Sequence, residues 1–343
     1  MSGFRRLTAA GLVWVLLCAY PAAVSFCEDS GDFAAAVVAY NDRRLDDALG
    51  CAKKAVRENP RHVDALALLG ELYYLKQDLS QAKETWEKAL KLAPSRQDVR
   101  QRLSQLQRES PVEKNLARSD TYPFVVRFDE GQMPVDLGEL RLLLRDTYRL
   151  VGQQFDYFPN HTVTVILYPQ VGFNQIKQLI HAAVGLYDGK IRLPIPQNLA
   201  GSGIPVSQEL KRVLWHEYTH ALVHDLSKGQ CPIWLNEGLA SLQESRVYNI
   251  QLDDFRGALN SGVLFRWEQF WNQPYDPKQL ALQYQQAYMM AGYLVKRWGW
   301  SKMVVLLKRL GEGYPIEDAI RAEYKAEPAV LEKEWLVWLK RNM

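Results

Sequence analysis

The chain has 343 residues, of which 48% are hydrophobic and 24% are charged, and its formal net charge is +3. This length exceeds one ordinary domain, and the hydrophobic content excludes a disordered or fibrous protein. Arg5 and Arg6 supply two of the three net charges, so the rest of the chain is close to neutral and gives no reason to expect a nucleic-acid partner.

The first 25 residues have the order of a secretory signal peptide. A basic start is followed by an apolar run over 7–20 and then by small residues that include Ala23-Val24-Ser25, a triplet that suits cleavage. The run is shorter than the roughly 20 apolar residues of a membrane-spanning helix. We therefore expect export to the periplasm or the extracellular space, with membrane attachment only if the leader stays uncleaved or Cys27 carries a lipid.

The segment from 29 to 96 repeats itself with a period of 34 residues, in the pairs Ala48 and Ala82, Ala55 and Ala89, and Pro60 and Pro94. Small residues let the two helices of a hairpin approach closely, bulky ones fill the remaining gap, and proline ends the second helix. The second unit has these residue types where tetratricopeptide repeats use them: Leu69-Gly70, Tyr73, Ala82, Trp86, Ala89 and Pro94. The segment resembles that repeat family, which implies stacked α-helical hairpins.

Residues 98–109 are polar and are expected to form a helix that caps the repeats, so the predicted repeat module covers 29–109. Residues 110–120 begin with Ser-Pro, are mostly polar and predict a linker. Two roles stay open for the module. It either binds a protein partner or only packs against the next domain.

The second domain, expected over 120–343, has an α+β pattern. Segments rich in β-branched and aromatic residues, or alternating in polarity, predict strands at 122–128, 162–168 and 189–195. Apolar residues at helical spacing predict helices from about Pro134, over 171–183, and nearly throughout from 207 to the end, with a break at 229–232. A small mixed sheet followed mainly by helices is the predicted architecture.

One helix of this domain carries the pattern H-E-x-x-H, at His216-Glu217-Tyr218-Thr219-His220. Helical residues four apart are separated by about 40° of rotation and about 6 Å of rise, so both imidazoles can bind the same ion. Glu217, about 100° further round the helix, can reach a water molecule on that ion. The pattern needs a third ligand.

His224 is a poor third ligand, because it lies about 12 Å along the helix axis from His216. A pattern that ends in a third histidine also needs a glycine where this chain has Val223. Glu237, in the early turns of a helix that Pro232 opens, is the better candidate. Two histidines and one carboxylate with a fourth position open to water are a catalytic zinc arrangement, whereas structural zinc sites are closed and usually contain cysteine.

The run "HEYTH" followed by "WLNEGLAS" resembles the gluzincin zinc metallopeptidases, and most of all the peptidase MA-like domains found beside tetratricopeptide repeats. The resemblance implies a thermolysin-like zincin domain over 120–343 with Zn²⁺ bound by His216, His220 and Glu237. It implies Glu217 as general base. It also implies that 183–195 forms an edge strand that pairs with an extended peptide or protein substrate.

Two further roles are left to find. The oxyanion of the reaction needs a donor, for which Tyr288 is the preferred candidate and Tyr284 the other, although core packing is the more common role for tyrosines on such an aromatic-rich face. Relatives often have an aspartate where this chain has Ser241, so the group that orients a ligand histidine must come from elsewhere, either Asp225 or Glu244.

These features predict an exported zinc-dependent peptidase whose substrate is a peptide or a protein. The alternative is a scaffold in which the peptidase fold survives without useful turnover and the repeats bind a protein partner. Retention of Glu217 favours the enzyme, because a scaffold has no physical need for a general base.

Overall fold

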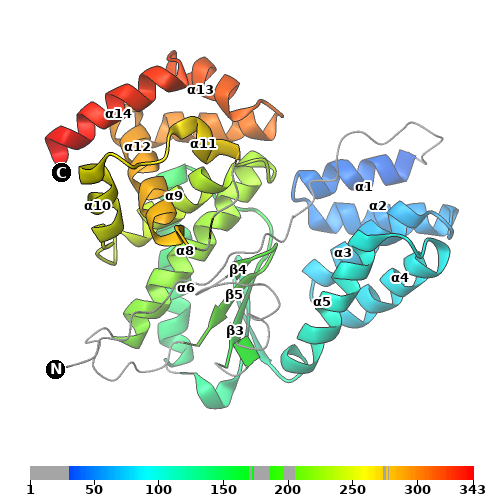
Figure 1. Ribbon diagram of the computed structural model, residues 1–343. Helices are drawn as coiled ribbons and strands as arrows, with labels where there is room; N and C mark the ends of the chain where they lie inside the picture. Colours follow the sequence, from blue (N-terminus) through cyan, green and yellow to red (C-terminus); the bar gives the residue numbers. More distant parts are fainter. Residues whose placement is uncertain are drawn as a thin grey trace.

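The computed structural model describes residues 31–133, 135–169, 172–173, 186–195, 205–272, 276 and 278–343. Helical repeats come first, a small mixed sheet follows, and helices make up the rest, so the predicted α+β architecture is confirmed (Figure 1). The predicted signal peptide lies outside the described residues, and so does nearly all of the helix predicted over 171–183.

The N-terminal repeats consist of α1 (Gly31–Asn41), α2 (Leu45–Glu58), α3 (Val63–Leu75), α4 (Leu79–Leu92) and α5 (Gln97–Glu113). Successive helices pack as hairpins. The repeat pattern has a direct steric reason at Gly70, where a Cβ atom would overlap the ring of Trp86. That indole also donates a hydrogen bond to the carbonyl oxygen of Ala67, at 3.1 Å, so α3 and α4 are held at close range.

The prediction of a linker at 110–120 is wrong. Helix α5 continues through Pro111 to Glu113, and strand β1 begins at Ala117. Several polar residues of the segment are exposed, but Glu113 within it and Glu109 just before it are each only 1% exposed. Their carboxylates face a buried arginine of the sheet, so the repeats and the sheet are joined by a packed helix.

The described strands form one five-stranded sheet in the order β1-β2-β3-β5-β4. Their bounds are Ala117–Thr121 for β1, Phe124–Phe128 for β2, Val163–Tyr168 for β3, Leu186–Tyr187 for β4 and Ile191–Pro194 for β5. Strands β2, β3 and β5 run parallel, and β1 and β4 are antiparallel to their neighbours. The three predicted strands correspond to β2, β3 and β5, and the short strand β4 lies at the edge.

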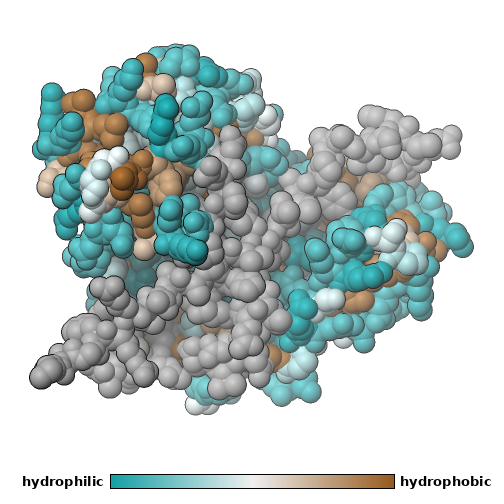
Figure 2. Space-filling model, viewed as in Figure 1, coloured by the Kyte–Doolittle hydropathy of each residue, from teal (hydrophilic) through white to brown (hydrophobic). Residues whose placement is uncertain are grey.

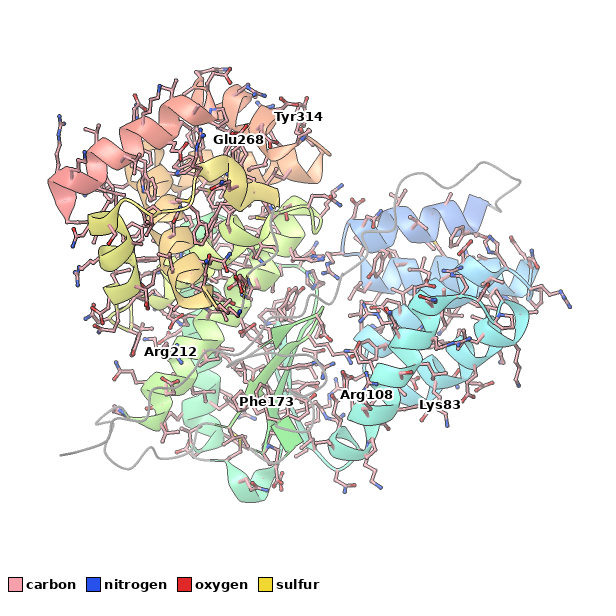
Figure 3. The ribbon with its side chains drawn as sticks, in the orientation of Figure 1. Lys83, Arg108, Phe173, Arg212, Glu268 and Tyr314 are labelled. Atoms are coloured by element: carbon pink, nitrogen blue, oxygen red, sulfur yellow. The ribbon has the colours of Figure 1, made fainter. Side chains whose placement is uncertain are left out.

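The two faces of the sheet are both covered. Ile191 and Leu193 of β5 point into the main hydrophobic core, which α6 (Leu137–Phe155) and α8 (Val206–Ser227) share. The opposite face of β3 packs Tyr168 against Phe173, which is labelled in Figure 3. Further along this second face, Arg192 of β5 is completely buried against the repeats.

Helices form the remainder of the second domain, as the sequence predicts. They are α9 (Ile233–Glu244), α10 (Asp253–Ser261), α11 (Trp267–Asn272), α12 (Leu280–Gly311), α13 (Ile316–Tyr324) and α14 (Pro328–Asn342), and a 3₁₀ turn, η1 (Glu130–Gln132), precedes α6. Figure 2 shows a mostly hydrophilic surface over the repeats and some exposed hydrophobic area on the C-terminal helices. Within the described part of the chain, no helix combines the length and the apolar character needed to cross a membrane.

Candidate metal centre

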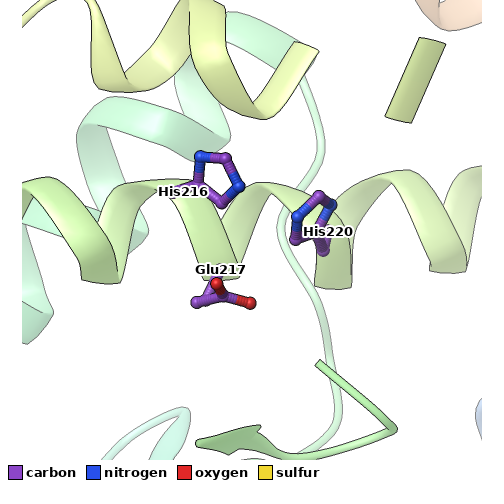
Figure 4. Close-up of side chains that lie close together, drawn as sticks. All are labelled: His216, Glu217 and His220. Carbon is purple, nitrogen blue, oxygen red and sulfur yellow. The ribbon is translucent and has the colours of Figure 1, made fainter. Parts of the chain in front are cut away.

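The two motif histidines lie on the same side of α8, as their spacing predicts. The ring centroids of His216 and His220 are 4.9 Å apart, with the ring planes nearly perpendicular (Figure 4). Helix α8 packs against α9 and against both strands of the hairpin formed by β4 and β5. The rings therefore lie between the sheet edge and the next helix of the chain.

Glu237 reaches the same two rings from α9. Helix α8 ends at Ser227, and Lys228 and Gly229 then take left-handed backbone conformations, with φ of 49° and 76°, which turn the chain back. The Oε2 atom of Glu237 lies 3.6 Å from Nε2 of His216 and 3.8 Å from Nε2 of His220. Ligand atoms at the corners of a tetrahedron around zinc are about 3.4 Å apart, so these distances are a few tenths of an ångström from a zinc geometry.

A glycine lets α9 approach the helix behind it. A Cβ atom on Gly238 would overlap the carbonyl oxygen of Ala287 and come within 2.8 Å of the Cβ atom of Ala291, both on α12. Because Gly238 follows Glu237 directly, this close approach fixes where the Glu237 carboxylate can lie. The glycine of the N-E-G sequence thus has a packing role beside the metal centre.

The other nitrogen of each ring is held by a hydrogen bond. Nδ1 of His216 lies 2.9 Å from Oε2 of Glu244, and Nδ1 of His220 lies 2.9 Å from Oδ1 of Asn236. Both partners are acceptors, so each ring donates from Nδ1 and turns Nε2 towards the centre. The choice left open between Asp225 and Glu244 is therefore settled in favour of Glu244.

Glu244 is itself fixed by a cation. Arg212, four residues before His216 on α8 and labelled in Figure 3, forms ion pairs with Glu244 and with Glu209. Asn236 and Arg212 were both missed by sequence reasoning. Asn236 could have been found, because it directly precedes Glu237 in the N-E-G sequence, whereas Arg212 carries no motif.

Glu217 differs from Glu237 in its surroundings. One ligand-type atom each of His216, Glu217 and His220 lies within 4.8 Å of the other two, so Glu217 also borders the centre (Figure 4). Its Oε2 atom is buried and has no hydrogen-bond partner among the described residues. Burial raises the pKa of Glu217 to about 8. Burial also opposes ionisation of Glu237, but His220 and then His216 outweigh it and lower the pKa of that carboxyl.

These residues fit a divalent metal ion of the zinc type. The candidate donor atoms are two imidazole nitrogens and one carboxylate oxygen, which converge on one point. Hydrogen bonds on the other side of each ring fix the orientation of the two imidazoles. Glu217, whose Oε2 atom has no hydrogen-bond partner among the described residues, borders the point where these atoms converge. Of the carboxylates near the histidines, Glu237 has an oxygen within 4 Å of both Nε2 atoms.

The tyrosine candidates lie in the helix that contacts α9. Tyr288 is half-buried on α12, directly after Ala287, whose carbonyl oxygen marks the close approach to Gly238. Tyr284 lies one turn earlier and is also half-buried. Both pack against the main core. The oxyanion role of Tyr288 stays a prediction.

His224, the third histidine of the run, belongs to a different site. Its Nδ1 atom lies 2.7 Å from Nη2 of Arg43, which comes from the turn between α1 and α2. The neighbouring Asp225 binds Nε of Arg43 at 3.1 Å and Nε2 of His161 at 2.7 Å. His224 therefore contacts the repeats through Arg43, and its role outside the metal site stays a prediction.

Comparison with known proteins agrees with this division of the chain. Residues 63–96, which span α3 and α4, match the family model of the tetratricopeptide repeat. No curated protein and no solved structure matches the chain. Residues 203–341, which carry every proposed metal ligand, match the family model of the Peptidase MA superfamily, so a region similar to that superfamily follows the repeat match along the chain.

Proposed function

We propose that the protein is a zinc metallopeptidase of the gluzincin type that hydrolyses peptide bonds in a peptide or protein substrate. His216, His220 and Glu237 would hold the ion. The observation that carries the proposal is the convergence of both Nε2 atoms on one oxygen of Glu237, at 3.6 and 3.8 Å, while both Nδ1 atoms are occupied by acceptors. The Peptidase MA superfamily match over 203–341 supports the same reading.

The chemistry divides between the ion and the protein. Bound zinc lowers the pKa of a water molecule and polarises the carbonyl group under attack. Glu217 accepts the proton of the attacking water on its unpartnered oxygen and returns it to the leaving amine. Tyr288, on the helix behind α9, is the proposed donor to the oxyanion.

The sheet edge is the proposed place for the substrate backbone. Strand β4 is the outermost strand beside β5, and both strands contact α8, which carries the motif histidines. An extended substrate can add to such an edge through main-chain hydrogen bonds. We also propose that the protein is exported, on the strength of its leader-like first 25 residues.

Metal analysis combined with a peptide-library digest tests the proposal. Wild type and Glu217→Gln should both contain one zinc per chain, and the variant should cleave about 10²- to 10⁴-fold more slowly because only the proton transfer is lost. Glu268→Gln, an exposed position on α11, is the matched control and should behave as wild type. If wild type lacks zinc, or if Glu217→Gln cuts as fast as wild type, the proposal is wrong.

The same experiment addresses the scaffold alternative. Stoichiometric zinc in wild type without cleavage of any library peptide would favour a protein that keeps the metal site for structure. Loss of zinc in Glu237→Gln, measured on the same preparations, would still identify the third ligand in that case. The ligand assignment and the catalytic assignment are therefore tested separately.

A further inference from the structure

The repeats present a polar, buried surface to the second domain. We call it the repeat face, and its residues are Glu71 and Tyr74 on α3 and Arg102, Gln105, Glu109 and Glu113 on α5. The four α5 residues follow one another at intervals of three or four and so share one side of the helix. In Figure 1, α3 and α5 lie on the side of the repeats that faces the sheet, and α4 lies further out. Repeat arrays commonly bind extended ligands on such a face.

Arg192 of β5 fills the centre of the repeat face. Its guanidinium is 3.0 Å from the carboxylate of Glu109 and 2.7 Å from that of Glu113, and it donates to the hydroxyl of Tyr74 at 2.5 Å. The side chain is completely buried. Burial opposes ionisation of Glu113, but Arg192 outweighs it and lowers the pKa of that carboxyl.

The turn between β4 and β5 adds two more buried charges. Asp188 accepts a hydrogen bond from Gln105 at 2.8 Å and lies 3.3 Å from Nε of Arg192. The ammonium group of Lys190 lies 3.3 Å from the centroid of the Tyr74 ring, a cation–π contact. Asp188, Lys190 and Arg192 are each 0% exposed. Every second residue from 188 to 192 therefore contacts the repeat face, and these contacts hold the hairpin formed by β4 and β5 against it.

A second contact holds the other strand of the same hairpin. Arg43, in a left-handed backbone conformation with φ of 59°, donates to the hydroxyl of Tyr187 on β4 at 3.2 Å. The same guanidinium binds Asp225 and His224 at the end of α8. One arginine of the repeats thus joins the sheet edge to the helix that carries the metal ligands.

Such a contact differs from an ordinary interface between domains, which usually permits relative motion. Removing one partner from a buried ion pair is strongly destabilising, because the other charge is left without compensation. The positions of the paired charges therefore determine how the repeats pack against the sheet. A rotation of the repeats would have to separate several buried charges at once.

We propose that the repeat module holds the β4–β5 hairpin of its own chain as its ligand, and that Arg43 and Arg192 are positioning residues for the substrate-binding edge. The consequence for substrate rests on the proposed peptidase function, whereas the seating of the hairpin does not. A protein partner of the repeats would then use another side of the module. Loosening the hairpin weakens substrate binding and leaves metal binding unchanged, because all three ligands lie on α8 and α9.

Arg43→Gln tests the proposal, with Arg44→Gln as matched control. Arg44 is the adjacent residue, is exposed and pairs only with nearby aspartates of the same turn region. Hydrogen exchange of the backbone amides of 186–195 should become faster in Arg43→Gln and stay unchanged in Arg44→Gln. Unchanged exchange in Arg43→Gln would overturn the proposal whether or not the protein is a peptidase.

Enzyme kinetics distinguish a positioning role of Arg43 from a purely structural one. In Arg43→Gln, KM for a cleaved peptide should rise about 3- to 30-fold, with kcat and zinc content close to wild type. Arg43→Lys should restore part of the loss because it keeps the charge. Tyr74→Phe, which removes one hydroxyl from the repeat face, serves if Arg43→Gln does not fold. A fall in kcat or zinc content at unchanged KM would contradict the positioning role.

Discussion

The metal centre and the repeat face are both buried clusters of charged residues, yet the charged groups are arranged differently in the two clusters. At the metal centre, two imidazole nitrogens and a carboxylate oxygen point at one another, and Glu217 keeps an oxygen without a partner among the described residues. At the repeat face, Arg192 lies against three carboxylates and two tyrosine hydroxyl groups. Lys190 Nζ and Glu113 Oε2 also lack a hydrogen-bond partner among the described residues, so the two clusters differ in geometry and not in completeness. Ligand-type atoms that converge on one point are suited to an external ion, whereas ion pairs that cross from one domain to the other are suited to holding the domains together.

Loss of Arg192 should have the largest effect on stability, because its role is structural. Arg192→Met is expected to lower the free energy of unfolding by about 3–5 kcal/mol, since three carboxylates would lose their shared cation. Denaturant unfolding measures the change. Burial raises the pKa of Glu109, so its neutral counterpart Glu109→Gln should cost much less. Equal losses in the two variants would mean that the repeat face is not organised around the arginine.

Glu244 and Asp225 separate the two regions most directly, because each carboxylate holds one histidine ring, Glu244 that of His216 and Asp225 that of His161. Glu244→Gln should weaken zinc affinity about 10- to 100-fold, since His216 would face a neutral amide in place of the charged acceptor that fixes its ring. Asp225→Asn should leave zinc affinity unchanged and weaken the contact with Arg43. Competition with a chromogenic chelator measures both. The opposite ranking would assign the wrong carboxylate to the metal centre.

Gly238 tests how tightly the metal centre is packed. Gly238→Ala should lower the free energy of unfolding by about 1–3 kcal/mol, because the new methyl group would meet the backbone of Ala287. Gly292→Ala is the control on α12, where the new atom would lie 3.5 Å from Leu242, an ordinary contact. Thermal unfolding of the two variants measures the difference. A control as unstable as Gly238→Ala would show that the helices tolerate neither change.

The smallest expected effect concerns acid sensitivity at the interface. Burial, and next the charge of Arg43, lower the pKa of His224 from 6.5 to about 3. The unfolded chain therefore binds a proton at His224 that the folded protein does not, and stability falls as the pH drops from about 6.5 towards 3. Tyr187, Tyr157, Asp225 and His161 are further titratable groups of this contact.

His224→Gln should lose less stability than wild type over this pH range. Melting temperatures at pH 7 and pH 4.5 measure it, and the remaining acid loss should come from carboxylates such as Asp225, whose pKa His161 and Arg43 lower against the effect of burial. If the variant and wild type lose the same amount, His224 does not stay neutral in the folded protein.

The residues of the candidate metal centre could be brought together from the sequence alone more fully than those of the interface, for a physical reason. Its ligands lie on two successive helices, so helix geometry and the short sequence between His220 and Glu237 place them together. The interface joins α1, α3, α5, the β4–β5 hairpin and α8, and no local spacing brings such segments together. The polar composition of 110–120 therefore predicted a linker, although Glu113 within this segment and Glu109 just before it are buried.

The alternation in 189–195 shows the same limit on a single strand. Alternating apolar and polar residues correctly predict β5, with Ile191 and Leu193 in the main core. The pattern also suggests that Arg192 faces water, because one face of such a strand is usually solvated. The repeats cover that face instead. Periodicity along a strand indicates which side a residue takes, and it does not indicate what lies on that side.

Helix α8 has one more consequence, which concerns insertions and deletions. His216 and His220 serve the metal centre, and two residues of the next turn, His224 and Asp225, receive Arg43. One residue inserted between His220 and His224 would turn the later pair by about 100° and leave the H-E-x-x-H sequence intact. A homologue with such an insertion would keep every motif residue and lose the contact between α8 and Arg43. The length of α8 after the motif is therefore as informative about a homologue as the motif itself.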